Sequence, residues 1–167
     1  TILDHYFPPA AWRPGDVVVT NDPYAGGGSL AATHSNDYLA FSPVFFAGEI
    51  VAFAGLMVHH LDIGATNMGS RGWGTEIYQE GLRVPPMKLV EEGRLEHKVM
   101  QVVLTNTRTP ETLENDLVSQ IASVQVAVDD VAALFRKYGA PTMKACFAAL
   151  MDHADQRTRA EIARIPD

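Results

Sequence analysis

The 167-residue sequence predicts an α+β protein, with a β-rich N-terminal half followed by a helical C-terminal half. Up to about residue 95, glycine and proline are frequent and apolar runs are short, which is typical of strands joined by turns. Beyond that point, apolar residues recur every three or four positions, which is the period of amphipathic helices. We therefore expect a β-rich segment over residues 1–95 and a helical segment over residues 96–167.

Three apolar runs predict the strands of the first segment. A turn at residues 13–16 leads into the β-rich run Val17–Thr20. The runs 38–46 and 50–58 are separated only by residues 47–49, which predicts a β-hairpin. Both of these runs are almost continuously apolar, so we expect strands that are covered on both faces.

The second segment contains clear signals for helix ends. Residues 96–106 predict a short helix, after which Thr109 and Pro110 supply an N-cap residue and a proline at the first helical position. Gly139 ends the long helix that follows, and Pro141 allows another to begin. We expect the two long helices to form an antiparallel helical hairpin that serves as a scaffold or an interface.

Composition excludes several classes of protein. The chain has 13 Lys and Arg against 20 Asp and Glu, and its basic residues are scattered, so we expect no nucleic-acid or membrane partner. The apolar stretch 41–53 is too short and too interrupted to span a bilayer. Cys146 is the only cysteine, which favours a reducing compartment, and we expect a cytoplasmic protein.

The two ends of the predicted hairpin carry candidate metal ligands. His34 and Asp37 precede its first strand, whereas His59 and His60 follow its second strand. An antiparallel hairpin brings these positions together at its open end, and adjacent strand residues face opposite ways, so only one of His59 and His60 can face a shared metal. Imidazole and carboxylate suit Zn²⁺, Mn²⁺ or Fe²⁺. A buried His–Asp hydrogen bond is the alternative, and residue types alone do not decide between the two.

A further polar segment, residues 75–86, contains two acids that are candidates for chemistry. Glu76 and Glu80 are four residues apart and would share a face of one helical turn. They would be either a general base with its partner, or capping and salt-bridge residues with Arg83. The glycine run at 26–28 lacks the Lys-Ser/Thr of a phosphate loop, so we predict no nucleotide site in this chain.

Five motifs follow one another along the sequence: GDVVVTNDPYAGG, THSND, HHLDIGA, TEIYQEGLRVPPMKLVEEGRL and NTRTPE. Together they resemble one known family, the hydantoinase B/oxoprolinase family, from about Gly15 to Tyr138 and in the family's order. Its members include the B subunit of N-methylhydantoinase, the C-terminal half of 5-oxoprolinase and a large subunit of acetone carboxylase.

The resemblance implies an ATP-dependent hydrolase of cyclic amides or lactams that works as a hetero-oligomer. A hydantoinase A-type partner subunit would use ATP to phosphorylate the small-molecule substrate, and this chain would act on the activated species at a site holding Mn, Zn or Fe. Because family subunits are several times longer, we expect the chain to be a stretch of a longer subunit. The alternatives are a subunit of an ATP-dependent ketone carboxylase and a non-catalytic assembly subunit.

The resemblance also implies roles for particular residues. The family's metal ligands fall on His34, Asp37 and His59, and a further aspartate ligand is expected upstream of Thr1. His60 and Asp62 then become candidates to orient His59 or the substrate. In the polar segment described above, Glu76 becomes a candidate for an acid/base role.

Overall fold

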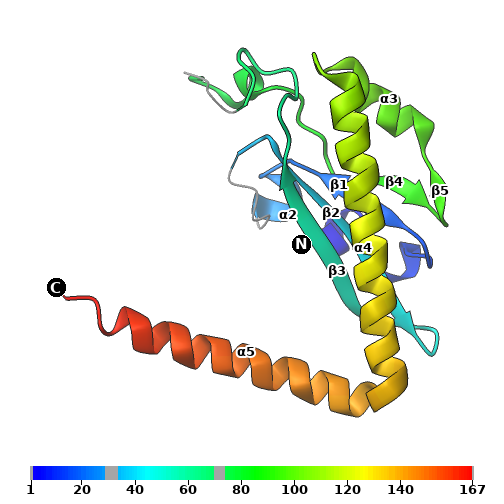
Figure 1. The fold of residues 1–167 in the computed structure, drawn as a ribbon, viewed down its shortest axis with the longest axis vertical. Helices are drawn as coiled ribbons and strands as arrows, with labels where there is room; N and C mark the ends of the chain where they lie inside the picture. The colour runs from blue at the N-terminus through cyan, green and yellow to red at the C-terminus, as the bar shows by residue number, and fades with distance from the viewer. Residues whose placement is uncertain (1, 29–33, 70–73, 167) are drawn as a thin grey trace.

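The computed structural model describes residues 2–28, 34–69 and 74–166, and it confirms the α+β prediction (Figure 1). A five-stranded antiparallel sheet has the strand order β3-β2-β1-β4-β5. The long helix α4 lies across one face of this sheet. The strands are β1 (Val17–Thr20), β2 (Asp37–Phe46), β3 (Glu49–His59), β4 (Met87–Glu91) and β5 (Arg94–Leu95). The helices are α1 (Ile2–His5), η1 (Pro9–Ala11), α2 (Ala25–Gly28), η2 (Ile77–Glu80), α3 (His97–Thr105), α4 (Pro110–Tyr138) and α5 (Ala140–Ile162).

The predicted hairpin is formed by β2 and β3. Its ladder runs from Asp37 opposite His59 to Phe46 opposite Glu49, with a register shift between Val44 and Phe45. The connecting residues Ala47 and Gly48 both have positive φ, 52° and 84°. Two central residues with positive φ are the signature of a type I′ turn, whose twist matches that of the flanking strands.

One apolar face of α4 forms the core together with the sheet. By length and composition this helix is apolar enough to cross a membrane, but in the structure it packs along β2 and β3. Core clusters join the helix to the sheet: Leu117 packs with Tyr38 and Leu89, and Ala132 packs with Val44. The buried residues of α4 are Leu113, Leu117, Gln120, Val124, Ala132 and Phe135.

The expectation that both hairpin strands are covered on both faces is correct for β2 and wrong for β3. Most of β2 is buried, but β3 is the edge strand of the sheet and is largely exposed. Its exposed side chains include Phe53, Leu56 and Met57. A continuous apolar run does not distinguish a central strand from an edge strand, because strand order depends on contacts between distant parts of the chain.

The two long helices form where the sequence predicts them, but they do not pack against each other as an antiparallel hairpin. Figure 1 shows α5 running away from the sheet and from α4 after the bend at Gly139. Met143, near the start of α5, is its only buried residue in the described part of the chain. From Asp152 to Glu161 the sequence of α5 is polar apart from two alanines, so it offers no apolar stripe that would hold it along α4.

Candidate metal centre

The open end of the hairpin brings together His34, Asp37 and His59. Asp37 Oδ1 lies 2.9 Å from His59 Nδ1, and Asp37 Oδ2 lies 3.4 Å from His34 Nε2. The two imidazole rings meet edge to face, with centroids 5.2 Å apart. One ligand atom from each residue lies within 4.8 Å of the others, which is the spacing expected of groups that share an ion.

This donor set fits a divalent metal. The Asp37 carboxylate is nearly buried between the two rings, while the His34 and His59 side chains are 50% and 44% exposed. Two imidazoles and one carboxylate suit Zn²⁺, Mn²⁺ or Fe²⁺, and the exposed side leaves room for water or substrate. The alternative is a pair of His–Asp contacts without a metal, which accounts for the same two distances.

Hydrogen bonds from the backbone and from two asparagine side chains hold the two chain segments that carry these residues. The His60 N–H donates to Asn36 O at 2.9 Å, and Asn36 Nδ2 donates to His60 O at 2.6 Å. On the other side, Asn21 Nδ2 donates to Ser35 O at 2.6 Å. The Asp37 N–H donates to His34 O at 3.0 Å, so a single tight turn carries both of these candidate ligands.

The structure places His59, and not His60, in the cluster. His60 is fully buried and its ring meets the Tyr38 ring at 5.1 Å, on the opposite side of the strand from its neighbour. The carboxylate of Asp116 lies 3.7 Å from His60 Nδ1. Burial lowers the pKa of His60, although Gln120 and Asp116 oppose this shift. Burial also raises the pKa of the Tyr38 hydroxyl.

The hydrogen-bond partners of Asp62 differ from those of the three candidate ligands. It is 1% exposed and accepts hydrogen bonds from the Arg108 N–H at 2.5 Å, from Arg108 Nη1 at 2.8 Å and from Thr107 Oγ1 at 3.2 Å. The Arg108 guanidinium also donates to Ala65 O. Asp62 therefore ties the loop after β3 to the junction of α3 and α4, a contact that its position in the sequence did not reveal.

Glu76 and Glu80 do not share a helical face. Glu76 has extended backbone, φ −149° and ψ 154°, and precedes the short helix η2 that ends at Glu80. Glu80 accepts a hydrogen bond at 2.8 Å from Ser35 Oγ, and Ser35 is next to His34 in the chain. Glu76 and Glu80 are both exposed. Glu80 is thus connected to the turn that carries His34, and the sequence did not reveal this contact.

Arg83, which the sequence suggested as a salt-bridge partner for these acids, has other partners in the described part of the chain. Its Nε lies 3.7 Å from Asp22 Oδ1. Its guanidinium lies 5.7 Å from the ring centre of Tyr24 and 5.8 Å from that of Tyr78. These are cation–π distances, so the arginine links the loop after β1 to the segment around η2.

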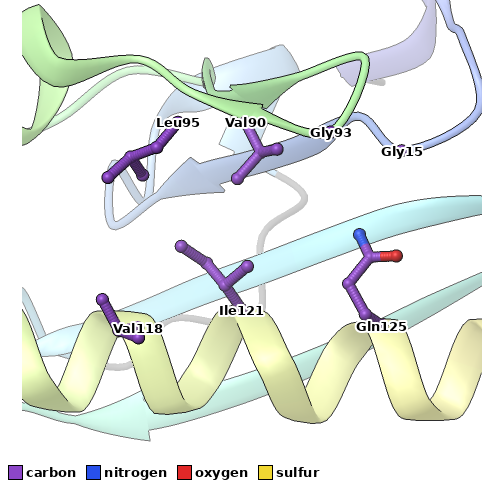
Figure 2. Close-up of a pocket in the computed structure, with 7 residues that line it drawn as sticks. All are labelled: Gly15, Val90, Gly93, Leu95, Val118, Ile121 and Gln125. Carbon is purple, nitrogen blue, oxygen red and sulfur yellow. The ribbon is translucent and has the colours of Figure 1, made fainter.

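An apolar cavity of about 290 Å³ lies elsewhere, between α4 and the turn that joins β4 to β5 (Figure 2). Val118, Ile121 and Gln125 line it from the helix, opposite the strand residues Val90 and Leu95. Its remaining lining residues are Gly15 and Gly93. The three candidate ligands are not among the residues that line this cavity, so it is a feature separate from the candidate metal centre.

Comparison with known proteins identifies the family. The model of the hydantoinase B/oxoprolinase family matches residues 1–167, the whole chain. The chain belongs to this family. This confirms the resemblance that its motifs suggest.

Relatives in the family are much longer than this chain. It is 36% identical over 154 residues to caprolactamase subunit beta of Pseudomonas jessenii, and covers 26% of that protein. It is 30% identical over 158 residues to 5-oxoprolinase 1 of Arabidopsis thaliana, and covers 12% of it. These matches include 92% and 87% of this chain. The chain therefore spans about a quarter or less of the length of these relatives.

A solved structure shows the same fold. The crystal structure of the ATP-dependent caprolactamase from Pseudomonas jessenii superposes with a TM-score of 0.80 at 32% identity. The match covers 99% of this chain and 27% of that chain. The fold of this chain is thus shared with part of an ATP-dependent caprolactamase.

Proposed function

We propose that this chain contributes the metal centre of an ATP-dependent enzyme that hydrolyses cyclic amides or lactams. The observation that carries the proposal is the convergence of His34, Asp37 and His59 within 4.8 Å, in a family that includes a caprolactamase subunit. Because the chain spans a quarter of that relative, we propose that the activity belongs to a larger assembly.

We propose that each of the three residues serves as a ligand to one divalent ion, Mn, Zn or Fe. Asp37 supplies the anionic ligand from the nearly buried floor of the site, and the half-exposed imidazoles of His34 and His59 supply neutral ligands at its rim. When bound, such an ion polarises an amide oxygen and lowers the pKa of bound water. Water or a further protein ligand would complete the set.

Other residues of the proposed site have supporting roles. His60 and Asp62 are one and three residues after His59, and their buried contacts fix the chain on that side. We propose that they position His59 rather than touch the substrate. Glu76 remains our candidate for acid/base chemistry, because it is exposed on the segment that reaches Ser35 through Glu80.

We further propose that a hydantoinase A-type subunit is the partner that uses ATP. The beta-subunit relative is one part of a multi-subunit enzyme, and the solved relative is ATP-dependent. The glycine run of this chain lacks the Lys-Ser/Thr of a phosphate loop, which leaves nucleotide binding to the partner. We expect the complex to act in the cytoplasm on a small molecule, without nucleic acid or membrane.

Metal analysis of the complete polypeptide, purified with its ATP-binding partner, tests the proposal. We expect stoichiometric Mn, Zn or Fe and ATP-dependent opening of a lactam or hydantoin ring, both lost in His34→Ala and His59→Ala. His97→Ala, an exposed histidine on α3, is the matched control and should keep both. Absence of metal together with full activity in the two variants would indicate an assembly subunit. Substrate consumption that requires bicarbonate would indicate a carboxylase.

A further inference from the structure

Three buried polar residues lie directly behind the open end of the hairpin. Tyr38, His60 and Gln120 are 0%, 0% and 2% exposed. Within the described part of the chain, the buried side-chain atoms without a hydrogen-bond partner are Tyr38 OH, both ring nitrogens of His60 and Gln120 Oε1. Burying such atoms costs stability, and here they all belong to one cluster. The Asp116 carboxylate, 3.7 Å from His60 Nδ1, offsets part of that cost, and the rest calls for a role other than stability.

Gln120 connects this cluster to both strands of the hairpin. From α4, its Nε2 donates to Tyr38 O in β2 at 2.8 Å and to Leu56 O in β3 at 2.7 Å. Tyr38 follows Asp37, and Leu56 is three residues before His59. One side-chain amide therefore holds both strands near the two candidate ligands that face each other across the hairpin.

Strand register decides whether these ligands meet. In the observed register, Asp37 lies opposite His59. A shift by one residue would turn one of the two side chains to the other face of the hairpin. A shift by two residues would keep the face but would place Met57 or Leu61 opposite Asp37 instead of a histidine.

The apolar pattern of the hairpin specifies this register only weakly. From Ile50 to Val58, β3 is apolar on both faces, and as an edge strand it is largely exposed, so a shifted strand would bury a similar apolar area. The turn at Ala47 and Gly48 sets the register at its own end. However, the irregularity between Val44 and Phe45 lies between that turn and the open end.

We propose that Gln120 is a positioning residue: its amide fixes the register of β2 against β3 and so places Asp37 opposite His59. Buried polar groups that specify register at a cost in stability are known from coiled coils. The effect on metal binding rests on the proposed function. The effect on register does not, and it is measurable without metal.

Mn²⁺ titration followed by electron paramagnetic resonance tests the link to the metal centre in the complete polypeptide. Gln120→Leu removes both donated hydrogen bonds. Gln120→Glu keeps the shape of the side chain but cannot donate to both carbonyls, since a carboxyl group has at most one O–H donor. We expect at least about a tenfold loss of Mn²⁺ affinity in both, with the fold retained by circular dichroism. Gln125→Leu is the matched control, since Gln125 lies on the same helix beside the apolar cavity, and its affinity should not change.

A cross-strand disulfide measures the register directly. Leu39 lies opposite Met57, so in a Cys146→Ser background the pair Leu39→Cys/Met57→Cys should oxidise readily. We expect a lower disulfide yield when Gln120→Leu is added, and recovery of Mn²⁺ affinity in the oxidised fraction because the bond locks the native register.

Two results would overturn the inference: native Mn²⁺ affinity in Gln120→Leu, or a loss that the disulfide does not restore, which would make Gln120 an ordinary packing residue. Failure of the proposed function would be distinguishable. In that case the protein with the native Gln120 would itself bind no Mn²⁺, while the disulfide yield would still report whether Gln120 sets the register.

Discussion

The two ends of the β2–β3 hairpin are built in opposite ways. At the turn end, Val44 and Ala54 pack with Ala132 of α4 in an apolar cluster. At the open end, the contacts are polar: Asp37 with His59, Asn36 with His60, and the buried His60 ring with Asp116. The same pair of strands therefore gains stability at one end and positions the three candidate ligands at the other.

This difference shows where substitutions should separate stability from metal binding. Apolar burial is not directional, so losing part of it at the turn end lowers stability without changing the geometry of the open end. Hydrogen bonds are directional, so losing them at the open end disturbs position more than it disturbs stability.

The largest expected effect is on metal binding in Asp37→Asn. Substitutions that only touch ligands indirectly reduce metal affinity about 10–100-fold, so loss of the anionic ligand itself should reduce it at least about 100-fold. Thermal unfolding should change little, because the amide keeps the shape of the carboxylate. Calorimetric titration with Mn²⁺ and a melting curve measure the two quantities. Unchanged Mn²⁺ affinity would show that Asp37 at the open end is not a metal ligand.

The second effect is on stability in Asp62→Ala. Removing a carboxylate that is 1% exposed leaves the Arg108 guanidinium and three N–H or O–H donors without their acceptor. Because the Arg108 side chain is 47% exposed and regains water, we expect a loss of about 2–3 kcal/mol, below the full cost of breaking a buried pair. Urea unfolding measures it. A loss below the error of that measurement would show that the loop after β3 is held by other contacts.

At the turn end, Val44→Ala should cost about 1–2 kcal/mol of unfolding free energy, because it removes two methyl groups from a fully buried site. Its Mn²⁺ affinity should equal that of the unsubstituted protein. If Mn²⁺ affinity fell along with stability, the two ends of the hairpin would not be independent of each other.

The smallest effect is expected for Gly48→Ala. A Cβ on Gly48 would meet no atom within 4 Å, so the cost arises only from the positive φ of 84° and should be about 1 kcal/mol. This variant also asks whether the turn alone sets the register at the open end. Native Mn²⁺ affinity would support a separate role for Gln120, and reduced affinity would assign the register to the turn.

Local features of the sequence were enough to predict much of this molecule. Helical periodicity with a proline at the first position and a glycine at the end predicted α4 within a residue. Two apolar runs around Ala47 and Gly48 predicted the hairpin, and strand alternation required that only one of His59 and His60 face the candidate metal centre. Turn chemistry and periodicity involve residues close in the chain, so they can be read directly.

Contacts between distant residues decided the rest. The edge position of β3 and the direction of α5 depend on which surfaces find partners, and an apolar run or a helical period does not contain that information. Gln120 bonds to Tyr38, 82 residues away, and Arg108 bonds to Asp62, 46 residues away. The sequence by itself predicted the hairpin and, through its resemblance to the family, the three candidate ligands at its open end. Only the tertiary structure decided what holds that hairpin in register, because a side chain on a distant helix is brought to both strands by folding.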